Sequence, residues 1–596
     1  MTPRPNLFLT GLVLWLSWAT AAAAEPRAQI RGEMDSALRA QLERAIGDVD
    51  GTPGSRFEAR RRARSAVEAA DALLRSEGYY QSTIQDVVEG DENPVAVIEI
   101  QPGQRFRLTE PTILWADPAP DPETGTAVTG EIGLTVGEPG RAVDVIAAEG
   151  RIVAGLTRRG YADASTQPRR VVVDHATFTV DPEFHIQAGR LVRLDGVRLE
   201  TRGPTNPTWV IGLAPWTPGD RFDPDKVAEL ERRLLETGVY DGVGVALSPQ
   251  DQITDDGLRP IIVTLTDRPR RVLEAGASFS TAEGSGVDVI WTHYNRFGRA
   301  DTLRYQARLA NIDSRIGADL SLPHWRRPGR TLTLSAAVVK EDTDAYQRTA
   351  LTLAADLRQR LGRTSWISYG LGIDAGNYDE NRYDPLTATP LNFNRDLVIL
   401  TGRGSAYIDR SNDPLDPTKG WRMTVSTQPT VVSGEATATF LRAESQVTGY
   451  LPMQSSAKTV LAGRLRLGSI LGADELSVPS DRLFYSGGGG SVRGFTYQGV
   501  NPTLPDDTPR GGLSLFETSI ELRQDIGRGF GMVAFLDAGS VGFQPTPDFS
   551  NLRYGAGLGI RYKLPFGPIR ADIALPLDKQ DSDADFQVYV SIGQAF

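Results

Sequence analysis

The C-terminal half of the chain is dominated by alternation of apolar and polar positions. In residues 552–564 the apolar side chains fall on every second position, and arginine, lysine and glycine fall between them. Residues 516–523 and 586–592 repeat this period of two. Successive side chains of a β-strand point to opposite faces, so the pattern predicts strands with one apolar and one polar face.

The N-terminal half, from residue 25 to about 268, has a different pattern with three similar units. The sequence T-P-G-S-R-F at 52–57 and T-P-G-D-R-F at 217–222 each precede a helical pattern, and E-P-G-R at 138–141 is a weaker middle copy. A glycine follows each helix, as suits the left-handed residue after a helix end: Gly78, Gly160 and Gly238. These glycines lie about 80 residues apart, and each unit reads strand–helix–helix–strand–strand.

The first 24 residues predict a secretory signal peptide. Arg4 precedes a short apolar run from Leu7 to Trp18, and three alanines at 22–24 form a small-residue cleavage site. A membrane anchor is the alternative, but the run is short for one. No later stretch reaches about 18 continuous apolar residues, so no other transmembrane helix is expected.

The composition of the chain argues against several classes of function. The formal net charge of −11 gives no electrostatic support for nucleic-acid binding. The absence of cysteine excludes disulfides, thiolate catalysis and zinc–thiolate sites. An exported chain of 596 residues without cysteine fits a bacterial envelope better than a small disulfide-stapled domain.

Long strands with one apolar and one charged face are the signature of a transmembrane β-barrel. The charged face is expected to line the lumen, because lipid penalises charge. About 325 residues, at roughly 20 per strand and connection, predict an antiparallel barrel of about 16 strands. A soluble β-sandwich is the alternative, but it needs fewer strands and no charged inner face.

The order of elements in the three N-terminal units resembles the POTRA domain, the periplasmic module of outer-membrane assembly and secretion proteins. On this resemblance the α+β domains are expected at 25–104, 105–188 and 189–268, followed by the barrel at 269–596. The three POTRA-like domains would lie in the periplasm and the barrel in the outer membrane.

Four features of the barrel half resemble the BamA/TamA/two-partner-secretion superfamily. The segment S-V-R-G-F at 491–495 is similar to its V-R-G-F/Y motif, which lies at the tip of a long extracellular loop folded back into the lumen. F-L-D-A-G at 535–539 is similar to the F-x-D-x-G strand motif that receives the arginine. Residues 557–576 resemble the penultimate hairpin, and Phe596 resembles the aromatic end of an outer-membrane β-signal.

The resemblance implies a loop anchor centred on Arg493, with four preceding glycines that allow tight folding. Asp537 is the expected acceptor and Glu521 a second one, because both fall on the inward face of their strands. An exposed loop arginine is the alternative. The neighbouring residues of the two motifs are Val492, Gly494, Phe495, Phe535 and Gly539.

Three POTRA-like units in a chain of this length resemble the TamA family most. That resemblance implies an assembly or translocation factor for β-rich clients such as autotransporters, with a TamB-like inner-membrane-anchored partner. Clients would enter by strand addition to POTRA edges and to a weakly paired lateral seam between the first barrel strand, about 272–281, and the last, 586–596. Gly593 could let the last strand bend, or could simply be a packing glycine, and Phe596 would end that strand at the seam.

Two alternatives stay open: a two-partner-secretion transporter that exports one exoprotein through the lumen, and a passive pore. No enzyme, cofactor or metal is predicted, because no histidine pair, phosphate loop or nucleophile elbow is present. The acidic patches at 506–507 and 581–585 lack calcium-loop spacing. The basic run at 60–64 is either a solvated helix face or a contact for anionic headgroups or a partner.

Overall fold

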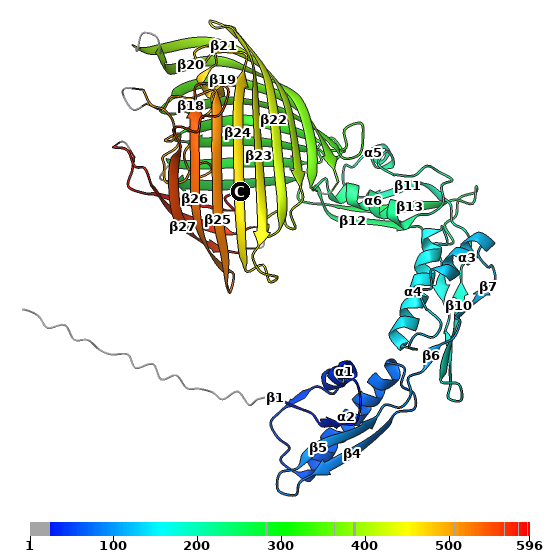
Figure 1. The fold of residues 1–596 in the computed structure, drawn as a ribbon. Helices are drawn as coiled ribbons and strands as arrows, with labels where there is room; N and C mark the ends of the chain where they lie inside the picture. Colours follow the sequence, from blue (N-terminus) through cyan, green and yellow to red (C-terminus); the bar gives the residue numbers. More distant parts are fainter. Residues whose placement is uncertain are drawn as a thin grey trace, which may run out of the picture. The chain divides into compact units, whose positions relative to one another are not determined.

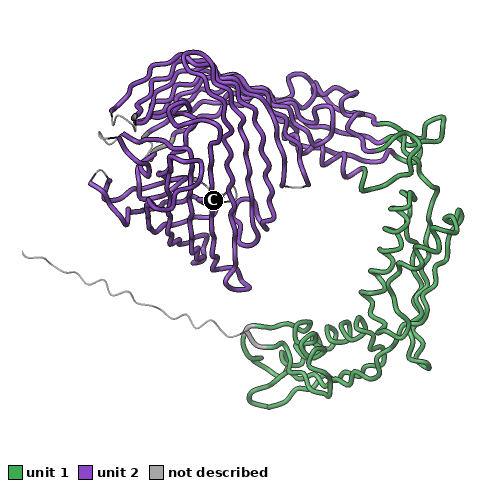
Figure 2. Tube along the Cα trace, turned by 45° about the horizontal axis from the view of Figure 1, so that its top comes forward, with its two compact units in different colours: residues 1–196, 216–226, 249–260 green, residues 197–215, 227–248, 261–596 purple. Residues whose placement is uncertain are grey.

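The computed structural model describes residues 24–280, 284–362, 364–384, 389–504, 508–564, 567–581, 583–592 and 594–596. Residues 1–23, with nearly all of the expected signal peptide, and Gly593 lie outside this range. The chain divides into two compact units, coloured in Figure 2. Unit 1 comprises residues 1–196, 216–226 and 249–260, and unit 2 comprises 197–215, 227–248 and 261–596.

Two small α+β domains follow each other in unit 1, labelled in Figure 1. The elements of the first are β1 (Ala24–Pro26), β2 (Gln29–Arg31), α1 (Ser36–Ile46), β3 (Asp48–Asp50), α2 (Arg56–Ser76), β4 (Thr83–Glu89) and β5 (Val95–Gln101). The elements of the second are β6 (Arg107–Leu108), β7 (Thr112–Ala116), α3 (Pro122–Gly130), α4 (Ala142–Arg158), β8 (Ser165–Thr166), β9 (Arg170–Asp174) and β10 (Thr179–Gln187).

Capping side chains and a glycine mark the ends of the helices in these domains. The Asp35 side chain caps α1 by accepting from the Leu38 amide at 2.7 Å, and Ser55 caps α2 by accepting from Glu58 at 3.2 Å. Gly78, with φ +91°, follows α2 in the left-handed region. The buried face of α2 is made mostly of small side chains, which let the helix lie close to its sheet: Ala59, Ala63, Ala66, Ala70 and Leu74.

The third α+β domain consists of β11 (Leu194–Thr201), α5 (Pro207–Ile211), α6 (Pro224–Leu235), β12 (Tyr240–Leu247) and β13 (Arg259–Asp267). The last long strand of each of the three domains is central in its sheet, with orders β2-β5-β4, β6-β10-β7 and β11-β13-β12. In the first domain β2 runs parallel to this central strand, and in the second domain β6 and β7 do. A parallel pairing requires a crossover, which the two helices supply.

The barrel is one 16-stranded antiparallel sheet in sequence order from β14 to β29 (Figure 1). Its strands are β14 (Arg271–Ser280), β15 (Gly284–Tyr294), β16 (Thr302–Ala310), β17 (Asp313–Leu322), β18 (Arg330–Asp342), β19 (Tyr346–Leu361), β20 (Ser365–Asp384), β21 (Thr389–Asp409), β22 (Gly420–Gly434), β23 (Ala438–Pro452), β24 (Thr459–Leu471), β25 (Ser514–Gly527), β26 (Phe530–Gly542), β27 (Arg553–Tyr562), β28 (Ile569–Pro576) and β29 (Gln587–Ile592).

The two faces of the barrel strands follow the alternation in the sequence. On β26 the outward Met532 and Leu536 are about half exposed, whereas the inward Asp537 is fully buried. On β25 Ile520 and Leu522 are likewise exposed, and Glu521 between them is buried. The predicted fold class, a barrel of 16 antiparallel strands preceded by POTRA-like domains, is confirmed. No helix in the described part of the chain is long and apolar enough to cross a membrane.

The lumen is less uniformly polar than the sequence predicts. The halves of β20 to β26 at the barrel end opposite Arg271 carry inward apolar side chains, and the long loop after β24 covers them with its own. The cluster comprises Tyr378, Leu397, Ile399, Val432, Phe440, Ile470, Leu515 and Val541 from strands, and Val478, Leu483, Phe484 and Leu513 from the loop. An inward apolar residue is stable here because the loop, and not water, is its neighbour.

The first barrel strand has nearly the predicted bounds, whereas the last is shorter than predicted. β14 covers 271–280, one residue from the predicted 272–281. β29 covers only 587–592, so the prediction of a last strand reaching residue 596 is wrong. Residues 594–596 follow another path, described below.

Candidate functional site: a loop anchored inside the barrel

The loop that carries the arginine motif connects β24 to β25 and spans residues 472–513. The chain enters β14 from the third α+β domain, so the Arg271 end of the sheet is the domain side. Alternating strand directions then place the connection after β24 at the opposite end. From there the loop folds back onto the inner wall, because its buried residues pack against inward side chains of several strands.

Arg493 lies at the tip of this loop and is only 2% exposed. Its Nε and Nη2 donate to the two carboxylate oxygens of Asp537 on β26, at 2.7 and 2.9 Å. The backbone N–H of Arg493 also donates to Asp537 Oδ2 at 3.0 Å. A bidentate pair with an added amide fixes both the direction of the side chain and the position of the loop backbone.

Two further strands, β25 and β28, and a second residue of β26 surround the guanidinium. Nη1 donates to Glu521 Oε1 on β25 at 2.7 Å, and Asp572 Oδ2 on β28 lies 3.5 Å away. The Phe535 ring on β26 stacks under the guanidinium, with 3.4 Å from Cζ to the ring centroid. One cation thus faces three fully buried carboxylates, two of which pair with a second cation: Arg523 donates to Glu521, and Arg561 pairs with Asp572.

The backbone of the tip is held as firmly as its side chain. Gly494 has φ +103°, and its N–H donates to the Tyr589 hydroxyl at 3.2 Å. That hydroxyl donates in turn to the Phe495 carbonyl at 2.9 Å. Opposite the tip, Gly555 on β27 leaves room for the chain, because a Cβ there would lie 1.8 Å from the Arg493 carbonyl oxygen.

The other motif residues line the same contact. Val492 and Phe495 are buried in a small apolar cluster with Val500. Gly539 permits the approach of Val492, whose Cγ2 would lie 2.6 Å from an added Cβ. The structure therefore brings together all of the loop and strand motif residues that the sequence singled out, with Glu521 beside them.

A second part of the loop contacts a different section of the wall. The short 3₁₀ turn at Ser480–Arg482 places Asp481 against Arg348 of β19, with 2.6 Å between Oδ2 and Nη1. Arg482 pairs with Asp374 of β20 at 2.6 Å. The Ser480 amide donates to the fully buried Glu380 of β20. The loop is therefore anchored both to β19–β20 and to β25–β28.

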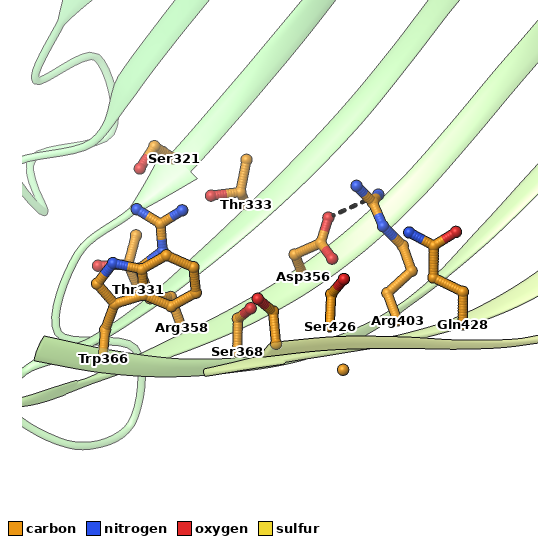
Figure 3. A pocket seen from close by; sticks show the side chains of 12 residues that line it. Ser321, Thr331, Thr333, Asp356, Arg358, Trp366, Ser368, Arg403, Ser426 and Gln428 are labelled. Atoms are coloured by element: carbon orange, nitrogen blue, oxygen red, sulfur yellow. Dashed lines mark hydrogen bonds and ion pairs between the residues drawn. The ribbon is translucent and has the colours of Figure 1, made fainter. Parts of the chain in front are cut away.

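The domain-side half of the lumen contains a polar cavity of about 470 Å³ (Figure 3). Arg403 pairs with Asp356 at 3.0 Å, and the Arg358 guanidinium lies 4.4 Å from the Trp366 ring centroid. The rest of the labelled lining is mostly hydroxyl and amide side chains: Ser321, Thr331, Thr333, Ser368, Ser426 and Gln428. Among the described residues no group of three His, Asp or Glu side chains is arranged to hold a metal ion.

The sequence analysis expected Gly593 and Phe596 at the seam between the first and last barrel strands. Gly593 lies outside the described residues. Phe596 is not at the seam: it packs on the inner face of β23 and β24, and its carbonyl accepts from Arg523 Nη2 of β25 at 3.2 Å. The expectation that Phe596 ends a regular last strand is therefore wrong, because pairing of β29 with β28 stops at Ile592 and contacts inside the lumen hold Phe596.

Several residues of the anchor were missed by the sequence analysis. Asp572, Ser519 and Tyr589 all contact the tip, and Arg464 donates to the Gly490 and Ser491 carbonyls at 2.8 and 2.5 Å. Asp572 carried a signal, since it alternates with outward Ile573 and lies in the quoted hairpin. Nothing local distinguishes Tyr589, because a tyrosine on an inward face is common.

A long loop pinned by a buried arginine inside a 16-stranded barrel, with α+β domains preceding it, defines the class of outer-membrane barrels that carry POTRA domains. The chain belongs to the Omp85 superfamily, whose domain model matches residues 295–596. Residues 27–102 match the model described as POTRA domain TamA domain 1. The barrel accordingly lies in the outer membrane and the POTRA domains in the periplasm, as the sequence analysis expected.

Two relatives of this chain are outer membrane protein assembly factors called BamA. The one from Nitratidesulfovibrio vulgaris is 22% identical over 433 residues, which cover 70% of this chain and 52% of that protein. The one from Neisseria meningitidis serogroup B is 21% identical over 560 residues, covering 85% and 66%. The chain thus spans about half to two thirds of the length of these relatives.

Among solved structures, the crystal structure of BamA from Haemophilus ducreyi lacking POTRA domains 1–3 is similar to this chain. The TM-score is 0.68 at 19% sequence identity, and the match covers 81% of this chain and 99% of that one. At this identity the similarity establishes the fold.

Proposed function

We propose that this protein is an outer-membrane assembly and translocation factor that inserts or secretes β-rich client proteins such as autotransporters. One observation carries the proposal. β14 has ten residues and β29 has six, so the described part of β29 cannot pair with the whole edge of β14. An incompletely paired strand edge offers backbone donors and acceptors to another strand.

The loop inside the lumen supports an assembly and translocation factor over a passive pore. The loop is anchored at two places in the wall and packs on an apolar cluster, so the barrel is not an open tube in this conformation. A passive pore would need a clear lumen. A client that adds to the edge of β14 can move into the bilayer sideways, and its strand pairing and apolar burial in lipid supply the free energy.

We propose that this protein is a superfamily member of the TamA type. We also propose that its first POTRA domain contacts a TamB-like partner anchored in the inner membrane. The match of residues 27–102 to the first POTRA domain of TamA supports this assignment. Unfolded outer-membrane proteins are the proposed clients, and their extended segments could add to free POTRA strand edges. We propose no enzymatic activity.

Quantitative proteomics of the outer membrane and periplasm, with and without this gene, tests the function. Loss of several barrel or autotransporter proteins from the outer membrane is the expected result. If instead a single large exoprotein accumulates in the periplasm while the outer membrane stays unchanged, the protein is a dedicated secretion transporter. No change in either compartment would contradict both roles and leave a pore.

A further inference from the structure

Residues 594–596 leave the barrel wall after β29 and lie on the inner face of β23, β24 and β25, four to six strands away in the sheet (the end marked C in Figure 1). Gln594 Nε2 donates to Asp416 Oδ1 at 2.9 Å, in the connection between β21 and β22. Two residues further on, Phe596 enters a recess of the wall. The path is therefore fixed at two points by side-chain contacts.

The recess combines apolar walls with two cations, and we call it the aromatic socket. Its apolar part is Tyr450, Val460 and Ala462, each at most 4% exposed, and the Phe596 ring packs against them. Its cations are Arg523 and Arg464, whose Cζ atoms lie 5.2 and 5.7 Å from the centroid of the Phe596 ring.

Both arginines are more than nine-tenths buried, and each keeps an unused donor. Within the described chain no hydrogen-bond acceptor lies opposite Arg523 Nη1 or Arg464 Nε. A buried donor without a partner is costly, so the wall favours a ligand that presents oxygen atoms. Desolvated guanidinium groups are also attracted to the face of an aromatic ring, so the recess favours an aromatic over an aliphatic side chain. The socket therefore suits an aromatic residue followed by carbonyl or carboxylate oxygens.

We propose that the aromatic socket is a binding site for an aromatic residue of an extended peptide, filled by Phe596 within the chain and by a client segment when a client displaces Phe596. The site lies on β23–β25 and is thus separate from the edge of β14, where strand addition would occur. The identity of the client rests on the proposed function, whereas the existence of the site does not.

The socket shares its arginines with the loop anchor. Arg464 also donates to the carbonyls of Gly490 and Ser491, next to the tip. Arg523 Nε donates to Glu521 Oε2 at 2.9 Å, and the other oxygen of Glu521 accepts from Arg493. Replacing the occupant of the socket changes the environment of both arginines, so a peptide that binds there is expected to loosen the loop.

Binding of a defined peptide to the full-length chain in detergent micelles tests the proposal. The probe is a fluorescent peptide of residues 585–596, D-F-Q-V-Y-V-S-I-G-Q-A-F, and its control ends in alanine. In fluorescence anisotropy, the Phe596→Ala chain should bind the probe at least about tenfold more tightly than the unaltered chain, because its socket is vacant. The control peptide should lose about tenfold in affinity for the Phe596→Ala chain.

Two further measurements show whether the probe binds in the aromatic socket or elsewhere. Adding Arg523→Met to the Phe596→Ala chain should abolish the difference between the two peptides, whereas adding Arg528→Met, at an exposed turn, should preserve it. A photo-crosslinking phenylalanine at the end of the probe should label β23–β25. Equal binding of both peptides, or crosslinks confined to β14, would overturn the proposal even if depletion of the protein impairs outer-membrane assembly.

Discussion

Glu521 joins Arg493 to Arg523 through its two carboxylate oxygens, at 2.7 and 2.9 Å. One buried carboxylate thereby connects the loop tip with the arginine that holds Phe596. Since all three side chains are at least 90% buried, loss of one partner weakens the charge compensation of the others. The loop anchor and the end of the chain are expected to respond to the same perturbations.

Replacing Arg493 with alanine should release the tip of the loop. The change removes a bidentate pair and leaves Asp537 buried without its cation and Glu521 with Arg523 alone, at a cost of about 3–5 kcal/mol. Single-channel conductance in planar bilayers should rise, because the tip no longer fills the lumen, and client assembly should fall. Arg528→Ala, at an exposed turn, is the matched control and should behave like the unaltered chain. Unchanged conductance for Arg493→Ala would contradict the anchor.

Gly555→Ala tests the loop position without removing a charge. The added Cβ would lie 1.8 Å from the Arg493 carbonyl oxygen, a backbone atom that can move only with the loop. We expect the tip to be displaced and the loop to become cleavable by an added protease. Gly449→Ala on β23 is the control, since its Cβ would meet nothing within 4 Å. Equal protease resistance of the two variants would refute the close approach.

The second anchor predicts a charge-reversal rescue. Asp481→Arg should detach the 3₁₀ turn from β19, because Asp481 is buried against Arg348, and the loss of such a pair costs about 3–5 kcal/mol. Arg348→Asp in the same chain should restore part of the thermal stability. The measurement is the unfolding temperature of the single and double variants in detergent. If the double variant is as unstable as the sum of the two singles, the pair does not hold the loop.

His324 predicts a pH-dependent contact between the barrel and Arg233 of α6, and both residues belong to unit 2. Its Nε2 donates to the Arg233 carbonyl of α6 at 2.9 Å, and its Nδ1 accepts from the Gly329 amide at 3.0 Å, so the ring is neutral. Burial lowers the pKa of His324 below 6.5, and the positive charges of Arg233 and Arg360 act in the same direction. The Arg233 carbonyl and the Glu236 carboxylate oppose the shift.

A lowered folded-state pKa means that the unfolded ring binds a proton more readily than the folded one. The stabilising contribution is therefore complete above about pH 6.5 and declines as the pH falls toward the folded-state value. Hydrogen exchange of the turn at 323–329 should be faster at pH 5.5 than at pH 7.5, after correction for intrinsic rates. In His324→Gln this dependence should disappear; if it persists, another group is responsible.

The sequence alone determined the properties that repeat along the chain. Alternation in 552–564 assigns Leu558 to the lipid and Arg561 to the lumen whatever the neighbouring strands are, because side-chain direction in a strand depends only on position. The repeated T-P-G and glycine signals likewise predict three α+β units. The motif around Arg493 and the strand residue Asp537 could be paired in advance by family resemblance.

Only the tertiary structure decided which inward side chains meet. Asp572 and Tyr589 reach the loop tip because of strand register and the path of a 42-residue loop, and no local pattern encodes either. The loop also turns inward Leu397 and Phe440 into a packed core, where alternation predicted a polar lumen. Phe596 was placed by a recess assembled from β23, β24 and β25, distant in sequence, and so the end of the chain was predicted wrongly.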